Sequence, residues 1–190
     1  MAHNNIEIEI KVRIENVQTL LDFLDKNGQF QGEHHQVDEY FTPAHKDYVS
    51  VRPVDEWLRL REQDGKFSIN YKLWHRDENG KSLYCDEVET SVGSTDQMRK
   101  IFTALECRSL IVVDKIRKAW IYNDYEVAVD SVKNLGDFVE IEYMGKDEAA
   151  DPKEITSQML EFLHSLNCGT IKEDNVGYPY LLLFEEEQTQ

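Results

Sequence analysis

The chain has 190 residues, 41% of them hydrophobic and 11% aromatic, so a folded domain with its own core is expected and a disordered chain is excluded. Lys and Arg number 21 against 37 Asp and Glu, and this formal net charge of −16 argues against nucleic acid or an anionic membrane as a partner. No apolar run reaches membrane-spanning length, no apolar signal segment opens the chain, and the three cysteines form no C-x-x-C, so we expect a cytoplasmic protein with reduced thiols.

The first predicted element is a strand at residues 6–14, which read Ile-Glu-Ile-Glu-Ile-Lys-Val-Arg-Ile. Apolar residues hold every even position and charges every odd one, which predicts a strand with an apolar face and an ionic face. The charged side chains Glu7, Glu9, Lys11 and Arg13 follow one another about 7 Å apart on one face. Taken alone, the pattern is more typical of a half-buried strand whose charges face solvent.

A helix is expected next, from Asn16 as N-cap to Gly28, with apolar residues at helical spacing between them. Residues 37–42 have the composition of a second strand. Residues 43–53 are polar and irregular, and we expect a loop that lies over an opening.

Two alternating segments, residues 57–62 and 67–73, predict strands joined by a hairpin at Asp64-Gly65. Residues 83–92 predict another strand, which carries two glutamates on one face.

Ser94 and Gln97 form a capping-box pattern, which predicts the start of a second helix. Three further strands are expected at residues 110–122, 125–132 and 138–143, with a tight turn between the first two.

The last long helix begins at Asp151-Pro152, where an N-cap is followed by proline at the first helical position. Residues 178–184 form a short apolar element, and residues 185–190 are expected to be a disordered tail outside a single domain of residues 1–184. The prediction is therefore about eight strands, mostly joined by hairpins and so antiparallel, with three helices.

Several of these strands carry paired charges on one face. The apolar stripes of the helices need a surface to cover, and the apolar faces of the strands are the only large one. We therefore predict an α+β fold, a closed eight-stranded antiparallel β-barrel with a charged lumen and helices packed outside. A one-sided sheet with its charges in solvent would give the same alternation. The basic residues on these faces are Lys11, Arg13, Arg59, Arg61, Lys72, Lys115 and Arg117, and the acidic ones are Glu7, Glu9, Glu87, Glu89, Asp130, Glu140 and Glu142.

A lumen with charges of both signs suits a particular ligand. Clustered Arg and Lys match the charges of a polyphosphate, and Arg binds its oxygens in bidentate fashion. Clustered carboxylates would repel that anion unless a divalent cation such as Mg²⁺ or Mn²⁺ lay between them. Both signs together indicate a metal plus a polyphosphate, and the alternative is a set of weak cross-strand ion pairs.

The order of these motifs resembles the CYTH superfamily, which groups class IV adenylyl cyclases with thiamine triphosphatases and related triphosphate hydrolases. The resemblance spans about residues 6 to 143, and Asp130 stands ahead of its last motif. The motifs are Glu7-x-Glu9-x-Lys11, Leu58-Arg59-Leu60-Arg61, Tyr71-Lys72, Glu87-Val88-Glu89-Thr90, Lys115-Ile116-Arg117 and Leu135-Gly136-Asp137-Phe138-Val139-Glu140-Ile141-Glu142.

The resemblance implies a triphosphate tunnel and a role for each charged position. Phosphates would be bound by Lys11, Arg59, Arg61, Lys72, Lys115 and Arg117. The metal would be bound by Glu7, Glu9, Glu140 and Glu142, with Asp130, while Glu87 and Glu89 would support basic side chains or a metal. Glu9, Lys11, Asp130 and Arg117 would be the catalytic set, with no protein nucleophile.

The late Leu-Gly-Asp-Phe-Val-Glu-Ile-Glu segment is most similar to the class IV adenylyl cyclase branch, which implies conversion of ATP to cyclic AMP and pyrophosphate with Mg²⁺ or Mn²⁺. A Ser-Tyr pair near the C-terminus of that branch is Gly177-Tyr178 here. Two alternatives stay open, namely hydrolysis of thiamine triphosphate, inorganic triphosphate or a nucleotide, and triphosphate binding without turnover. The expected partner is thus a nucleoside or other triphosphate, and the oligomeric state stays open, with a homodimer among the options.

Overall fold

The computed structural model describes residues 6–145 and 151–185. Within them it has ten strands, four α-helices and one 3₁₀ turn. The strands are β1 (Ile6–Glu7), β2 (Glu9–Ile14), β3 (Gln29–Thr42), β4 (Glu56–Gln63), β5 (Lys66–Arg76), β6 (Ser82–Ser91), β7 (Arg108–Tyr122), β8 (Tyr125–Val132), β9 (Gly136–Tyr143) and β10 (Ile171–Glu173). The helices are α1 (Val17–Asn27), α2 (Thr95–Ala104), α3 (Pro152–Ser165) and α4 (Tyr178–Leu183), and the 3₁₀ turn is η1 (Tyr48–Ser50).

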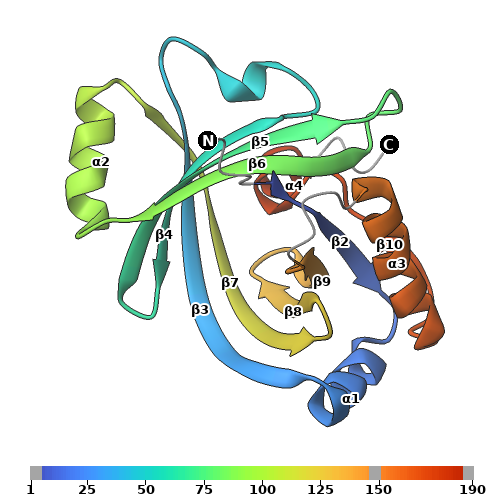
Figure 1. Cartoon of the computed structure of the whole chain (residues 1–190). Helices are drawn as coiled ribbons and strands as arrows, with labels where there is room; N and C mark the ends of the chain where they lie inside the picture. Colours follow the sequence, from blue (N-terminus) through green and yellow to red (C-terminus); the bar gives the residue numbers. More distant parts are fainter. Residues whose placement is uncertain (1–5, 146–150, 186–190) are drawn as a thin grey trace.

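The strands form one sheet in the order β1-β6-β5-β4-β3-β7-β8-β9-β2-β10, and every pairing is antiparallel. The sheet curls strongly, and the long strands β3 and β7 arch across its middle (Figure 1). The predicted α+β class and antiparallel pairing are therefore confirmed.

The prediction of a closed eight-stranded barrel is wrong in that form. The N-terminal segment is interrupted at Ile8, so that Glu7 pairs with Cys85 of β6 while Glu9 pairs with Glu142 of β9. β1 and β6 share two residue pairs, and β10 adds a further strand beside β2. The two ends of the curled sheet are therefore linked by the short β1 and β2 strands. A closed barrel would need one continuous strand that pairs with both of its neighbours along its whole length.

Local sequence signals set the helix ends and the hairpins. The side chains of Asn16, Ser94 and Asp151 each accept a hydrogen bond from a backbone N–H of the first turn, as predicted for N-caps. Asp64 and Gly65, at the β4–β5 turn, have φ of 51° and 74°, the left-handed backbone that such turns require. β3 begins at Gln29, earlier than predicted, because pairing with β7 extends a polar segment that has no alternation of its own.

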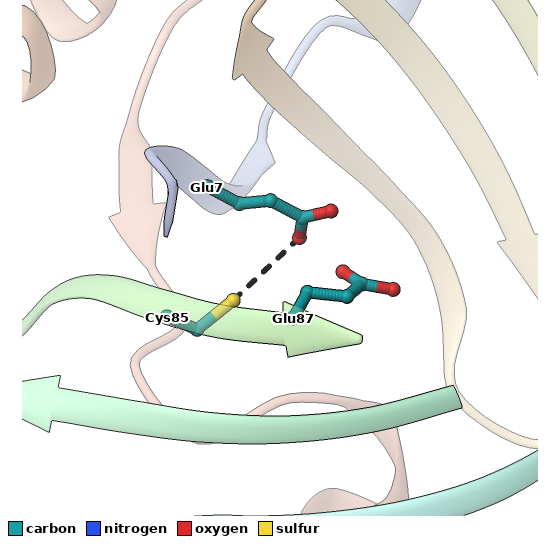
Figure 2. Close-up of side chains that lie close together, drawn as sticks. All are labelled: Glu7, Cys85 and Glu87. Atoms are coloured by element: carbon teal, nitrogen blue, oxygen red, sulfur yellow. Dashed lines mark hydrogen bonds between the residues drawn. The ribbon is translucent and has the colours of Figure 1, made fainter. Parts of the chain in front are cut away.

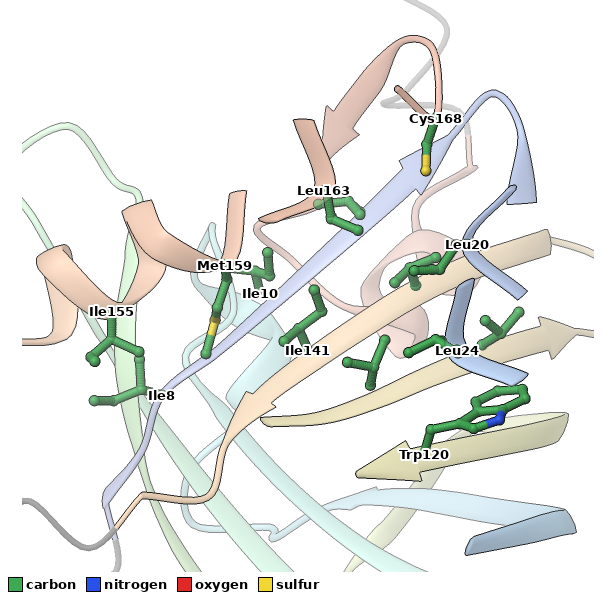
Figure 3. Close-up of a cluster of buried hydrophobic side chains, with 14 residues drawn as sticks. Ile8, Ile10, Leu20, Leu24, Trp120, Ile141, Ile155, Met159, Leu163 and Cys168 are labelled. Carbon is green, nitrogen blue, oxygen red and sulfur yellow. The ribbon is translucent and has the colours of Figure 1, made fainter. Parts of the chain in front are cut away.

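The main hydrophobic core lies on the outer face of β2, β8 and β9, beneath α1 and α3 (Figure 3). Ile8 and Ile10 point away from the charged face and pack with Met159 and Leu163 of α3. This is the arrangement that the alternation at residues 6–14 predicts. The fully buried side chains here include Val12, Leu20, Leu24, Val127, Val139, Ile141, Met159 and Leu163.

Two further clusters place α2 and α4. Phe102 of α2 packs with Phe41 and Leu60 on the outside of β3 and β4. α4 is different, because Tyr178 and Leu181 pack with residues of the inward faces of the strands, such as Phe138. Helices therefore cover the outside as predicted, except that α4 occupies one end of the hollow.

Four smaller predictions concern a loop, the thiols, membrane-spanning segments and the tail. The segment 43–53 contains η1 and contributes Val49 to the cluster around α4. All three cysteines are free thiols. Among the described residues no helix is both long and apolar enough to cross a membrane. Apart from Glu185, the predicted tail lies outside the described residues.

Candidate functional site

The inward faces of the strands surround a cavity of about 380 Å³. All six cations predicted to bind phosphate line it, which excludes the alternative in which the charges face bulk solvent. Arg13 does not line it, and its guanidinium lies 4.0 Å from the centre of the Phe138 ring. The basic residues of the lining are Lys11, Arg59, Arg61, Lys72, Lys115 and Arg117, and the acidic ones are Glu7, Glu9, Asp38, Glu87, Glu89, Glu126, Glu140 and Glu142.

Asp38 of β3 holds the two arginines of β4. Arg61 donates from Nε and Nη2 to its carboxylate at 2.7 Å each, and Nη1 of Arg59 lies 3.4 Å from Oδ2. Burial by itself would raise the pKa of Asp38, but Arg61 and Arg59 prevail and hold it well below its usual range. Asp38 was not among the predicted site residues, although it lies on the same buried face of the strand as Tyr40, two residues away.

Of these two arginines, Arg59 makes the longer and weaker contacts with carboxylates. Its ion pairs with Asp38, Glu87 and Glu89 measure 3.4, 3.6 and 4.0 Å, all longer than a good hydrogen bond. Its guanidinium therefore keeps donor capacity for an incoming anion.

Asp130 of β8 holds the two cations of β7 in the same way. Arg117 donates to its two oxygens at 2.7 Å each, Lys115 Nζ lies 2.8 Å away, and the hydroxyl of Tyr178 donates at 2.8 Å. Asp130 is fully buried. Its carboxylate is thus occupied by four hydrogen bonds, and Asp130 is absent from the cavity lining. Burial, together with the neighbouring Arg117, lowers the pKa of Lys115 to about 8.

The two remaining lysines each have a carboxylate partner on a neighbouring strand. Lys11 Nζ lies 3.2 Å from Glu140 and 4.4 Å from the centre of the Tyr178 ring. Burial opposes its charge, yet Glu140 and Glu9 raise the pKa of Lys11 above its ordinary value. Lys72 Nζ lies 2.7 Å from Glu7 and 2.7 Å from Glu87, so it pairs with two carboxylates at once.

Glu7, Cys85 and Glu87 form one group of possible metal ligands, with their donor atoms all within 4.8 Å of one another (Figure 2). The Cys85 thiol donates to Glu7 at 3.5 Å. Burial and a hydrogen bond with Glu87 raise the pKa of Glu7 to about 8, so the pair shares a proton near neutral pH. A buried thiol is a poor ligand for Mg²⁺, and Lys72 already neutralises both carboxylates.

A second carboxylate group crosses three neighbouring strands. Glu9 of β2 pairs in register with Glu142 of β9, and Glu142 pairs with Glu126 of β8. Burial, with the nearby Glu9 and Glu140, raises the pKa of Glu142 to about 7. Glu126 was not among the predicted site residues, although it lies on the same face of β8 as Asp130, four residues away.

Comparisons with known proteins agree with this geometry. The family model described as the CYTH domain matches residues 5–178. A protein of Methanocaldococcus jannaschii named "putative adenylate cyclase" is 34% identical over 172 residues, which cover 90% of this chain and 93% of that protein.

Solved structures show the same fold. The PH1819 protein of Pyrococcus horikoshii has a TM-score of 0.77 at 23% identity, covering 94% of this chain and 99% of that one. A Hippeastrum protein, described as a "putative adenylyl cyclase" with a dominant triphosphatase activity, has a TM-score of 0.64 at 19% identity, covering 95% and 96%.

Proposed function

Because the chain belongs to the CYTH domain family, we propose that it is a metal-dependent enzyme that converts ATP to cyclic AMP and pyrophosphate inside the cavity. The observation that carries the proposal is that six Lys and Arg side chains and eight carboxylates line one hollow. Charges of both signs suit a polyphosphate together with a divalent cation, and neither ligand alone. The relative that is 34% identical is named "putative adenylate cyclase", which favours this reaction.

The basic side chains would bind the triphosphate. Asp38 and Asp130 fix two pairs of cations from neighbouring strands, so the cations are held in place before the ligand arrives. Such preorganisation lowers the ordering cost of binding. Arg59, whose ion pairs are long, is the side chain best placed to exchange its carboxylate partners for phosphate oxygens.

The carboxylate group of β2 and β9 fits Mg²⁺ or Mn²⁺, because hard cations prefer carboxylate oxygens. Glu9 and Glu142 would hold the cation, with Glu140 beside them on β9. Glu7 is the weaker candidate, because Lys72 lies 2.7 Å from its carboxylate. When bound, the cation would neutralise phosphate charge and lower the pKa of the attacking hydroxyl.

In the reaction the ribose 3′-oxygen forms a bond to the α-phosphorus, and the bond from that phosphorus to the bridging oxygen of the β-phosphate breaks. Pyrophosphate leaves with the bonding electrons. The hydroxyl proton passes to a carboxylate of the cavity wall, for which Glu9 is the candidate, and then to solvent. Lys11 and Arg117, which face the cavity beside Glu140, stabilise charge that builds up on the phosphates.

A second candidate function is triphosphate hydrolysis, which the Hippeastrum structure favours through the activity in its description. In that reaction water attacks the terminal phosphorus, and orthophosphate is the product. The same cations and carboxylates would serve both reactions. The two reactions differ in which phosphorus atom the nucleophile attacks.

Product analysis separates the candidates. The purified protein is incubated with ATP, inorganic triphosphate and thiamine triphosphate, each with Mg²⁺ or Mn²⁺, and the products are resolved by chromatography. Cyclic AMP with equimolar pyrophosphate from ATP supports the cyclase, whereas orthophosphate with the corresponding diphosphate supports the hydrolase. Binding without any product would overturn both and leave a triphosphate sensor. The Glu9→Ala variant is the control for contaminating activity.

A further inference from the structure

We propose that Arg76, the last residue of β5, is a positioning residue that holds Tyr178 in the wall of the cavity, although Arg76 itself does not line that cavity. It acts through the segment 174–177, which leads from β10 into α4. The inference rests on the proposed function in one respect, since that function is what makes a triphosphate the ligand of the cavity.

Tyr178 connects α4 with the cations of the cavity. Its hydroxyl donates to Asp130 at 2.8 Å, and its ring centre lies 4.4 Å from Lys11 Nζ and 5.0 Å from Lys115 Nζ. Tyr178 is the first residue of α4, a helix of six residues. So short a helix has little stability of its own. The position of Tyr178 therefore depends on what holds the chain that precedes the helix.

The guanidinium of Arg76 holds that preceding chain against β5 and β6. Its Nη1 donates to the backbone carbonyl of Asn175 at 2.9 Å and to the hydroxyl of Ser82 at 3.0 Å. The hydroxyl of Ser82 donates in turn to the same carbonyl of Asn175, at 3.1 Å. The Asn175 carbonyl thus accepts one hydrogen bond from each of two neighbouring strands.

The guanidinium is itself fixed in place. Its Nε donates to Asp55 at 2.6 Å, and its Nη1 also lies 3.1 Å from the carbonyl oxygen of Gly80. The side chain of Arg76 is 10% exposed, so water competes little for these contacts. A charged donor makes hydrogen bonds about twice as strong as a neutral one, so Arg76 is the stronger of the two donors to Asn175.

The connection from Asn175 to Tyr178 is short and stiff. The carboxylate of Asp174 accepts hydrogen bonds from the backbone N–H groups of Val176 and Gly177, at 3.1 and 3.3 Å. Gly177 has a φ of 81°, in the left-handed region that favours glycine. A displacement of Asn175 is therefore passed on to Tyr178, and from its hydroxyl to Asp130.

Arg99 offers a matched comparison on the outside of the sheet. Its Nε donates to Glu39 at 2.6 Å and its Nη1 donates to Asp96 at 2.9 Å, so it ties α2 to β3. Like Arg76, it is an arginine that joins two elements through a carboxylate. Its contacts do not include the segment 174–177, so Arg99→Ala removes a comparable side chain without moving Tyr178.

The test is a double-mutant cycle, with the affinity for inorganic triphosphate measured by titration calorimetry on the full chain. We expect Arg76→Ala to weaken binding about tenfold, and the double variant Arg76→Ala with Tyr178→Phe to bind no more weakly than the weaker of the two single variants. Arg99→Ala should leave the affinity unchanged. Wild-type affinity in Arg76→Ala would overturn the proposal, and so would losses that simply multiply in the double variant.

Two milder variants cover an Arg76→Ala protein that fails to fold. Ser82→Ala removes one of the two donors to the Asn175 carbonyl and should weaken binding about threefold. Arg76→Lys keeps a charged donor without the fork of the guanidinium, so its affinity should lie between those of wild type and Arg76→Ala. Wild-type affinity in Ser82→Ala, or in its place an additive effect with Tyr178→Phe, would contradict the proposed route through Asn175.

The hydroxyl proton of Tyr178 provides a readout that needs no ligand. A buried hydroxyl that donates at 2.8 Å is protected from exchange with water, and its proton NMR signal is identified by its absence from Tyr178→Phe. We expect the signal to be lost in Arg76→Ala and kept in Arg99→Ala. If the wild type binds no triphosphate while the signal depends on Arg76, the proposed function is refuted and this inference stands. If Arg76→Ala keeps the signal, the inference is refuted whatever the wild type binds.

Discussion

Asp38 accepts two hydrogen bonds from Arg61, whose Nε and Nη2 atoms each lie 2.7 Å from its carboxylate oxygens in the wall of the cavity. Asp130 receives the same bidentate pair from Arg117, also at 2.7 Å. In each case the carboxylate comes from a strand next to the one that carries the arginine. A buried aspartate therefore fixes the position of each cation pair before any anion enters.

Replacement of Asp38 by Asn should lower the free energy of unfolding by about 3 kcal/mol, because two half-buried guanidinium groups lose the buried counterion that they share. Inorganic triphosphate should then raise the melting temperature more in Asp38→Asn than in wild type, since the ligand becomes the counterion. Turnover per folded molecule should fall, because Arg59 and Arg61 lose their fixed position. Thermal melts with and without triphosphate measure the first two effects, and equal ligand shifts in both proteins would contradict the argument.

Arg59→Ala and Glu9→Ala should each abolish turnover at little cost in stability. The ion pairs of Arg59 are 3.4 Å or longer, and those of Glu9 are 3.7 and 3.8 Å, so neither side chain contributes a strong contact to the fold. Urea unfolding and product assays on the same preparations test both variants. If either variant unfolds while its remaining folded fraction keeps wild-type activity, that side chain is a structural ion pair.

Binding of inorganic triphosphate should weaken as pH rises through about 8, because the pKa of Lys115 in the free protein is lowered to about 8. A bound anion favours the protonated lysine, so affinity is full below that pKa and falls above it. Lys115→Arg stays charged and should flatten the profile. Ionisation of Glu7 and Glu142, whose pKa values are raised to about 8 and about 7, contributes a slope that both proteins share. Titration calorimetry on either side of pH 8 makes the comparison, and identical profiles would refute the assignment to Lys115.

Tyr178→Phe should weaken triphosphate binding and lower the free energy of unfolding by about 1 to 2 kcal/mol, because Asp130 loses a buried hydrogen bond of 2.8 Å. The ring itself stays in place beside Lys11, so the cavity keeps its shape. Tyr125→Phe is the matched control, since the Tyr125 hydroxyl donates to Gln158 outside the cavity. Equal effects of the two substitutions would show that Tyr178 does not position the Asp130 group.

Alternation in the sequence predicted which face of its strand each charged side chain occupies. Alternation at residues 6–14 and along β4, β7 and β9 separates charged from apolar positions, and the structure keeps that separation. The order of charged motifs indicated the family. The helix starts at Asn16, Ser94 and Asp151 were also readable, because capping depends on neighbours within a few residues.

How these faces meet depends on strand pairing and packing across the whole fold. Three features depend on contacts between residues far apart in the chain. They are the split of the N-terminal segment at Ile8, the position of α4 at one end of the cavity, and the neighbours of Asp38 and Glu126 on adjacent strands. Alternation says which face a side chain is on, but register across strands decides whether a carboxylate meets an arginine, as Asp38 does, or another carboxylate, as Glu126 does. That difference separates the carboxylates that pair with cations of the protein from those that face another carboxylate.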